Sequence, residues 1–218
     1  MFKVIVFDFD GVLVDSNRIK DEAWSDVFGD LPENEKQVAL ELFPKVAVRT
    51  RYVILDEIFR ALGRRDAERI TLIRAHAEKY NQITQTGILR KGLIGGVWEA
   101  LEELSKKYKL YLNSSTPIEA LGESVDNLGI GKFFAEIFGR PETKESALEK
   151  IFALEQVGGN QTGFVGDGEP DRVAAEAYGC FFIGILSGFT NWTKNEKFVT
   201  IDSVRDVPEI ITRKESDE

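Results

Sequence analysis

The sequence predicts an α/β fold, in which a doubly wound parallel sheet forms a core and carries an inserted all-helical domain. Short runs of β-branched and aromatic residues alternate with helical segments, which is typical of a parallel sheet. The runs VIVF at 4–7 and FFIGIL at 181–186 are continuously apolar, as expected for strands buried on both faces. After the first run, apolar residues recur with a helical period over a long stretch, and this stretch predicts the inserted domain.

Six runs predict the strands of the sheet, and four segments predict helices that connect the later strands. The predicted strands cover 3–7, 110–113, 135–138, 163–166, 180–185 and 198–201. The predicted helices cover 97–107, 117–127, 143–155 and 171–178. Thr143 is a residue type that caps helix N-termini and Gly179 is typical of a helix end, so both support these limits. The polar residues 213–218 are expected to form a frayed tail.

The inserted helical domain is predicted over residues 16–92, where no strand-like run of comparable strength occurs. A connection between neighbouring parallel strands needs only about a dozen residues, so an insertion of this length is expected to fold as a unit. Trp24 and Phe28, four residues apart, are expected in its core. We therefore predict a sheet core of residues 1–15 plus 93–218, with a helical domain whose tips can lie over the sheet.

Composition limits the partners and the compartment. The 218 residues carry a formal net charge of -9 with a sequence pI of about 4.9, which argues against nucleic acid or an anionic membrane as a partner. The single cysteine, Cys180, excludes a disulfide framework within the chain and is expected to be a small core residue. No segment reaches the roughly 18 uninterrupted apolar residues of a membrane span, so we expect a cytoplasmic protein.

The candidate chemistry lies at the carboxyl ends of the predicted strands, where open α/β sheets bind ligands. Polar residues follow three strands and begin one helix: DFDG at 8–11, SSTP at 114–117, GDGEPD at 166–171 and Lys144. Four carboxylates among them, Asp8, Asp10, Asp167 and Asp171, would repel one another at one sheet edge unless a cation lay between them. Such hard oxygen ligands favour Mg²⁺, which makes phosphoryl transfer the expected reaction class.

These same residues carry a resemblance to a known family. DFDGVLVDS at 8–16, Ser114 after a hydrophobic strand, Lys144 and GDGEPD at 166–171 resemble the four ordered motifs of the haloacid dehalogenase superfamily. The resemblance spans nearly the whole chain. The insertion between the first two motifs is similar to the helical cap of the family's small-molecule phosphatases and phosphoglucomutases.

The resemblance implies a covalent mechanism for the first motif. Asp8 would attack phosphorus and form an aspartyl-phosphate. Asp10 would protonate the leaving oxygen and afterwards remove a proton from the water that hydrolyses the intermediate. Because a halide needs no proton, Asp10 favours phosphate esters over the substrates of family dehalogenases.

The other motifs are implied to bind the metal and the phosphoryl group. Magnesium would be held by Asp8, by the backbone carbonyl of Asp10, by Asp167, and by Asp171 directly or through water. Ser114 would donate to phosphoryl oxygens, and Ser115 is a weaker candidate for the same role. Lys144 would offset negative charge, whereas Lys150 lies farther along the same predicted helix.

Several functions remain open from the sequence. A phosphatase for small phosphorylated metabolites is favoured, but a β-phosphoglucomutase-type enzyme would carry the same motifs. A catalytically silent binding protein and a nucleotide-binding α/β protein are less well supported, because the candidate catalytic residues are present and no strand is followed by G-x-x-x-x-G-K-[ST] or G-x-G-x-x-G. The substrate, and whether the protein is a monomer or a homodimer, are left undecided.

A small basic cluster in the insertion has two interpretations. In one, Lys45, Arg49 and Arg51 bind an anionic leaving group; in the other, which is favoured because Arg49 and Arg51 are two apart and do not share a helix face, they form a solvated surface. His76 and Trp192 are interpreted as packing residues.

Overall fold

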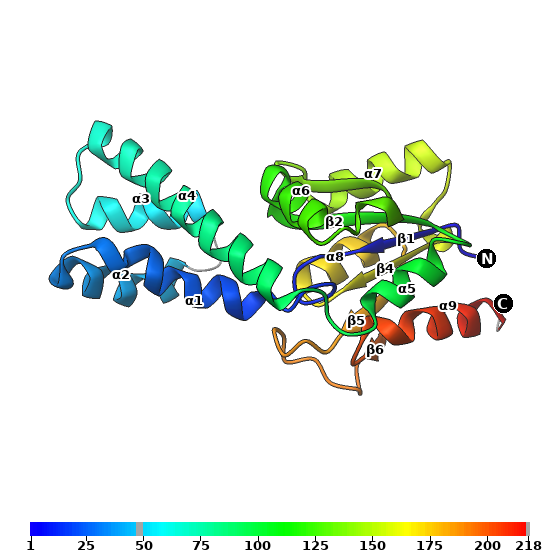
Figure 1. Cartoon of the computed structure of the whole chain (residues 1–218). Coiled ribbons are helices and arrows are strands. Elements are labelled where there is room, and N and C mark those ends of the chain that lie inside the picture. Colours follow the sequence, from blue (N-terminus) through cyan, green and yellow to red (C-terminus); the bar gives the residue numbers. More distant parts are fainter. Residues whose placement is uncertain (47–49, 217–218) are drawn as a thin grey trace. The chain divides into compact units, whose positions relative to one another are not determined.

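The computed structural model describes residues 1–46 and 50–216, which form two compact units (Figure 1). The first, here called the sheet unit, comprises Met1–Asn17 and Ile88–Glu218, and the second, the helical unit, comprises Arg18–Gly87. The predicted fold class, a parallel α/β sheet with an inserted helical segment, is confirmed.

The sheet unit contains a six-stranded sheet in the order β3-β2-β1-β4-β5-β6, and every neighbouring pair is parallel. The strands are β1 (Val4–Phe7), β2 (Lys109–Pro117), β3 (Phe134–Arg140), β4 (Thr162–Gly166), β5 (Phe181–Ile185) and β6 (Val199–Ile201). Each of the six predicted strands overlaps one of them. The chain runs outward from β1 to β3 and then returns to place β4 on the other side of β1. This reversal is the topological switch point at which ligands bind in such sheets.

Helices cover both faces of the sheet, which explains why β1 is apolar throughout. On one face, α5 (Val97–Leu104) contacts α9 (Val207–Ser216); on the other, α7 (Lys144–Glu155) contacts α8 (Glu169–Ala177). Val4 and Val6 belong to the core cluster that includes residues of α7 and α8. All four β1 side chains are fully buried, so neither face tolerates a polar residue. The remaining helix, α6 (Ile118–Asn127), packs on β2 and β3, and short 3-10 turns lie at Gly131–Phe133, Gly159–Gln161 and Val204–Asp206.

The helical unit contains α1 (Asn17–Val27) from Arg18 onward, α2 (Glu33–Val46), α3 (Arg51–Ala61) and α4 (Asp66–Lys91) as far as Gly87, with a 3-10 turn at Phe28–Asp30. Trp24 is buried, and its ring centroid lies 5.6 Å from that of Phe28 and 4.5 Å from that of Tyr80. Both predicted core aromatics of the insertion are therefore confirmed. His76 packs edge-on against Phe59 at 4.8 Å between centroids, in agreement with the packing interpretation.

The basic cluster of the insertion is only partly described, because Arg49 lies outside the described residues. Lys45 is in the last turn of α2. Arg51 begins α3, where its guanidinium lies 4.9 Å from the centroid of the Tyr80 ring and donates to Asn81 over 3.4 Å. These contacts hold Arg51 within the helical unit, and a role in ligand binding stays a hypothesis.

The predicted frayed tail is wrong as far as Ser216, because α9 continues to that residue. Val207 and Ile211, four residues apart, are fully buried and anchor the helix. Near its end, Glu215 accepts a hydrogen bond from the Phe2 backbone N–H over 2.7 Å and one from the Tyr108 hydroxyl over 3.0 Å. The polar composition of the last residues predicts fraying because the sequence does not reveal these distant partners.

Cys180 lies just before β5 rather than inside it, and it is half-buried against the core instead of fully enclosed. Burial nevertheless raises the pKa of its thiol to about 12. Trp192 packs against Phe182 and Phe198, as the packing interpretation requires.

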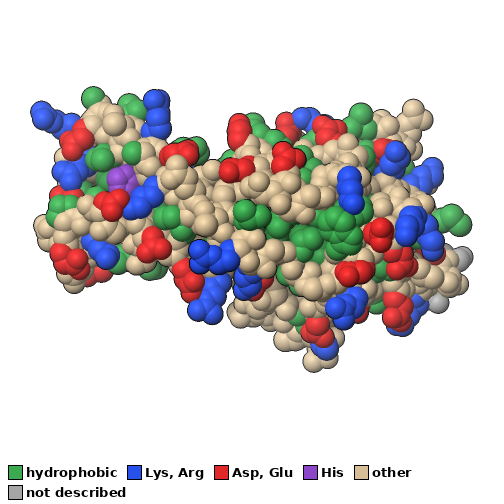
Figure 2. Space-filling model, viewed as in Figure 1, with side chains coloured by type: hydrophobic (Ala, Val, Ile, Leu, Met, Phe, Trp, Pro, Cys, Tyr) green, Lys and Arg blue, Asp and Glu red, His purple; other side chains and the backbone are tan. Residues whose placement is uncertain are grey.

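The described surface carries charges of both signs. On the face shown in Figure 2, Lys and Arg side chains are interspersed with Asp and Glu side chains. Among residues 1–46 and 50–216, no helix is long and apolar enough to cross a membrane.

Replacement of Glu215 by alanine tests the anchoring of α9. We expect Glu215→Ala to lower the free energy of unfolding by about 1–2 kcal/mol, because two hydrogen bonds to a charged acceptor are lost. Glu209→Ala is the matched control on the same helix, since Glu209 forms an exposed ion pair with Arg213 and should contribute at most about 0.5 kcal/mol. Urea denaturation of both variants measures the difference, and equal losses would contradict the proposed anchor.

Candidate active site

The candidate site lies at the carboxyl ends of β1 and β4, the two central strands. Asp8 follows β1 and Asp167 follows β4. Phe7 pairs with Val165, and the Asp8 N–H donates to the Val165 carbonyl over 2.8 Å, so the two strands end at nearly the same level. The switch point thus places carboxylates from the first and the fourth motif beside each other.

Three buried carboxylates form a cluster at this edge. Oxygen atoms of Asp8, Asp167 and Asp171 all lie within 4.8 Å of one another. Burial raises the pKa of Asp8 to about 7, even though the Lys144 ammonium acts in the opposite direction. Burial also raises the pKa of Asp167 to about 7 and raises the pKa of Asp171 above its ordinary value. Burial therefore disfavours the ionised form of these carboxyl groups, and a bound cation would favour it.

Lys144 is the cation that the chain itself supplies to this cluster. Its ammonium nitrogen lies 2.6 Å from Asp8 Oδ1 and 2.7 Å from Asp171 Oδ1, and it also donates to the Asn113 carbonyl. Burial acts to lower the pKa of Lys144, but the charges of Asp171 and Asp8 outweigh burial and raise it above its ordinary value. Lys150 points elsewhere and pairs with Glu142 at the surface.

Helix starts place Lys144 and Asp171 at the sheet edge. The Thr143 hydroxyl accepts from the Ser146 N–H over 3.1 Å, so α7 begins at Lys144. Asp171 lies in the first turn of α8, where its Oδ2 accepts from the Gly168 N–H over 3.0 Å. Both helices begin at the carboxyl edge of the sheet, as parallel strand–helix connections require.

The cluster has the chemistry of a divalent-cation site. If its three carboxylates are ionised, Lys144 leaves two negative charges without compensation. Mg²⁺ prefers carboxylate oxygens of this kind and carries two positive charges. The residues present therefore fit a magnesium ion.

Asp10 lies beside this cluster but has different partners. The Ser16 hydroxyl donates to Asp10 Oδ1, and the Thr116 hydroxyl donates to Asp10 Oδ2 over 2.8 Å. Ser114 is buried, and its hydroxyl oxygen accepts from the Thr116 N–H over 3.1 Å. Ser115, the weaker phosphate candidate, is exposed. The structure thus brings Ser114 and Asp10 together through Thr116.

Sequence reasoning assigned no role to several residues that surround the site. Ser187 and Asn17 donate to Asp167 Oδ2 over 2.6 and 3.0 Å. Asn113 donates to the Lys144 carbonyl over 2.9 Å. Thr116 carries a readable signal, because alternation along a strand puts residues 114 and 116 on one face. No sequence pattern identifies Ser187, because it lies in a loop after β5 and only the folded chain brings it to Asp167.

Gly11 makes the turn after β1 possible. Its φ is +73°, a backbone conformation that favours glycine, and its N–H donates to the Val14 carbonyl over 2.8 Å. A Cβ atom at this position would lie 1.8 Å from Asp167 Oδ2. The turn can therefore approach the fourth motif only without a side chain.

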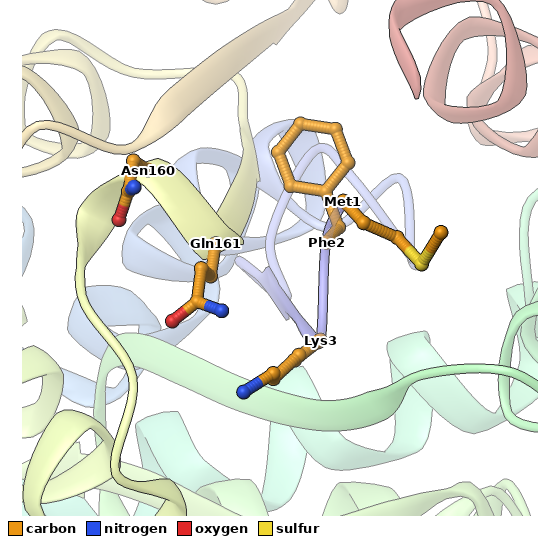
Figure 3. A pocket seen from close by; sticks show the side chains of 5 residues that line it. All are labelled: Met1, Phe2, Lys3, Asn160 and Gln161. Carbon is orange, nitrogen blue, oxygen red and sulfur yellow. The ribbon is translucent and has the colours of Figure 1, made fainter. Parts of the chain in front are cut away.

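A cavity of about 420 Å³ lies at another part of the sheet unit (Figure 3). Its lining comes from residues 1–3, where the chain enters β1, and from Asn160 and Gln161, just before β4. These are the amino ends of the strands. The cavity is thus separate from the carboxylate cluster at the carboxyl ends.

Comparisons with known proteins agree with this architecture. A family model described as haloacid dehalogenase-like hydrolase matches residues 2–179. A predicted phosphoglycolate phosphatase from Haemophilus somnus 129pt has a similar structure, with a TM-score of 0.72 and 21% identity over 96% of this chain and 98% of that chain. β-Phosphoglucomutase from Clostridium difficile has a TM-score of 0.71 and 18% identity, over 100% and 98% of the two chains.

A 2-haloacid dehalogenase from Pseudomonas syringae pv. Tomato DC3000 is also similar, with a TM-score of 0.66 and 19% identity over 98% of this chain and 100% of that chain. No curated protein matches the sequence. Identities this low show the fold alone. Because the three similar structures carry names of different enzymes, the reaction must be argued from the side chains of the site.

Replacing Gly11 by alanine tests the close approach to Asp167, with Gly92→Ala as the matched control. Both glycines have a φ of +73°, but nothing lies within 4 Å of a Cβ built on Gly92. We expect Gly92→Ala to lower the free energy of unfolding by about 1 kcal/mol through backbone strain alone. Gly11→Ala should lower it by about 2 kcal/mol more, because the methyl group displaces a buried carboxylate. If chemical denaturation shows the same loss of unfolding free energy for both variants, the close approach of Gly11 to Asp167 does not restrict the side chain at position 11.

Proposed function

Because the chain belongs to the haloacid dehalogenase-like hydrolases, we propose that it is a magnesium-dependent phosphatase of small phosphorylated metabolites. The observation that carries this proposal is the buried cluster in which Lys144 contacts Asp8 and Asp171. Asp167 completes the cluster. Such an arrangement provides a nucleophilic carboxylate, a cation that offsets its charge, and oxygen ligands for Mg²⁺.

In the first half of the proposed reaction, a carboxylate oxygen of Asp8 attacks phosphorus. The bond between phosphorus and the ester oxygen breaks, its electron pair passes to that oxygen, and Asp10 gives the oxygen a proton. The products are the free alcohol and an aspartyl-phosphate on Asp8. Ser114 and Lys144 would donate to phosphoryl oxygens and so stabilise the charge in the transition state.

In the second half, water attacks the phosphorus of the aspartyl-phosphate. Asp10, now ionised, takes a proton from this water as the new bond forms. The bond between phosphorus and Asp8 breaks, which releases inorganic phosphate and restores both carboxyl groups to their starting states.

The metal ligands are proposed to be Asp8, the backbone carbonyl of Asp10, Asp167 and Asp171. Bound there, Mg²⁺ would neutralise charge on the carboxylates and on the phosphoryl oxygens. Asp171 contacts Lys144 and the Gly168 N–H, and it would bind the ion directly or through water. Ser187 and Asn17 would orient Asp167 toward the ion.

Asp10 distinguishes this proposal from a dehalogenase, because a departing halide takes no proton. A phosphosugar mutase would form the same aspartyl-phosphate but pass it to a second sugar hydroxyl instead of water. A catalytically silent binding protein would retain the fold without turnover. An assay of phosphate release from a panel of phosphorylated metabolites with Mg²⁺, run beside a mutase assay on β-glucose 1-phosphate, distinguishes the three. A cytoplasmic location stays a prediction.

The nucleophile is tested by Asp8→Asn. We expect its rate of phosphate release from 4-nitrophenyl phosphate to fall by at least about 10³-fold, because an amide cannot form the covalent intermediate. Asp15→Asn is the matched control: Asp15 belongs to the same motif but is exposed and paired with Lys91, so this variant should retain activity. An unchanged rate in Asp8→Asn would exclude Asp8 as the nucleophile.

Metal binding is tested by thermal unfolding with and without Mg²⁺. We expect Mg²⁺ at about 100 times its Kd to stabilise the folded protein by about 2.7 kcal/mol and thus raise the Tm. Asp167→Asn should abolish this rise, whereas Asp202→Asn, which alters only an exposed pair with Lys194, should retain it. The proposed site is wrong if Mg²⁺ leaves the Tm of the unaltered protein unchanged, or raises that of Asp167→Asn equally.

A further inference from the structure

Thr116 lies on an irregular part of β2 at the edge of the candidate site. Asn113 pairs with Phe138, but the next pair joins Pro117 to Arg140, so β2 advances by four residues where β3 advances by two. Bulges of this kind redirect side chains and are common next to active sites. Thr116 is only 8% exposed. The Thr116 hydroxyl thus lies in the site, within this irregular segment of β2.

Thr116 contacts two of the residues in the proposed mechanism. Its hydroxyl donates to Asp10 Oδ2 over 2.8 Å, and its backbone N–H donates to the Ser114 hydroxyl oxygen over 3.1 Å. Because the Ser114 oxygen accepts this bond, the hydrogen of the same hydroxyl can be directed at a phosphoryl oxygen. One residue thus links the proposed acid to the proposed phosphate ligand.

We propose that Thr116 is a positioning residue for Asp10, and this inference rests on the proposed phosphatase function. Thr116 holds one oxygen of the Asp10 carboxyl group, and Ser16 holds the other. Hydrogen bonds to both oxygens fix the plane of the group, whereas a bond to one oxygen leaves it able to rotate. The branched side chain of threonine restricts χ1 and so keeps its hydroxyl directed at Asp10.

The position of Asp10 matters when the leaving oxygen needs a proton. As the bond between phosphorus and the ester oxygen breaks, the electron pair passes to that oxygen, and Asp10 supplies its proton. A general acid contributes roughly 10² to 10⁴-fold to such a step, and a misplacement of about 1 Å can forfeit much of that contribution. A leaving group that is stable as an anion at neutral pH gains little from the acid. Loss of positioning should therefore selectively slow phosphoryl transfer from esters that have poor leaving groups.

The test compares Thr116→Val on two esters that share an aromatic ring, phenyl phosphate and 2,4-dinitrophenyl phosphate, with Mg²⁺ present. We expect kcat/KM for phenyl phosphate, which reports only the first half of the reaction, to fall about 10- to 100-fold, while kcat/KM for the dinitrophenyl ester falls less than about threefold. Thr116→Ser should restore most of the loss. Turnover of the dinitrophenyl ester also reports that the variant is folded.

Two further variants separate positioning from a general structural effect. Thr162→Val removes another buried threonine hydroxyl of the same sheet, one that donates to the Gly158 carbonyl, and should leave the ratio of the two kcat/KM values unchanged. In an Asp10→Asn background, Thr116→Val should add little further loss on phenyl phosphate, because the acid on which it acts is already absent.

Equal losses of kcat/KM on both esters, or a full additional loss in the Asp10→Asn background, would overturn the positioning role while leaving the proposed phosphatase intact. If the unaltered enzyme releases phosphate from neither ester nor from any metabolite of the panel, the proposed function fails and the inference fails with it. A selective loss on phenyl phosphate, rescued by serine, establishes it.

Discussion

The buried contact of Lys144 with Asp8 and Asp171 is the interaction on which the rest of the site depends. Moving carboxylates out of water is unfavourable by several kcal/mol each unless charges and hydrogen bonds compensate. Lys144 can compensate only because α7 begins at that residue and because its backbone carbonyl is held by Asn113 of β2. The ends of β1 and β2 and the starts of α7 and α8 must therefore meet at one point, and this requirement constrains the sheet edge.

Strand order satisfies this requirement. The reversal between β1 and β4 places Asp8 beside Asp167, although a long insertion and two strands separate them in sequence. Glycines then let the backbone approach the carboxylates. At Gly166, as at Gly11, an added Cβ would overlap an acidic side chain, here within 2.3 Å of the Asp171 Cβ. The acidic cluster is thus packed against bare backbone, which explains both its burial and the raised pKa values of Asp8 and Asp167.

Asp8 and Asp10 are only two residues apart, yet they have different environments and different proposed roles. Asp8 contacts an ammonium group and lies within 4.8 Å of two other carboxylates, which suits a nucleophile that shares a cation. Asp10 is held by the hydroxyls of Ser16 and Thr116, which fix the position of a group that is proposed to transfer protons. The chain bends at Phe9 and turns at Gly11, so the two side chains reach these separate partners.

The sequence by itself determined the fold class, the positions of the strands, the helical insertion and the placement of the motif carboxylates and Lys144 at strand and helix ends. These features are readable because periodicity and capping are local and because parallel strands end at one edge. The order of the strands, the continuation of α9 to Ser216, and the contacts of Asn17 and Ser187 were decided only by the tertiary structure. Each depends on a partner far away in sequence, and no local sequence pattern predicts the partner of a single hydroxyl or amide group.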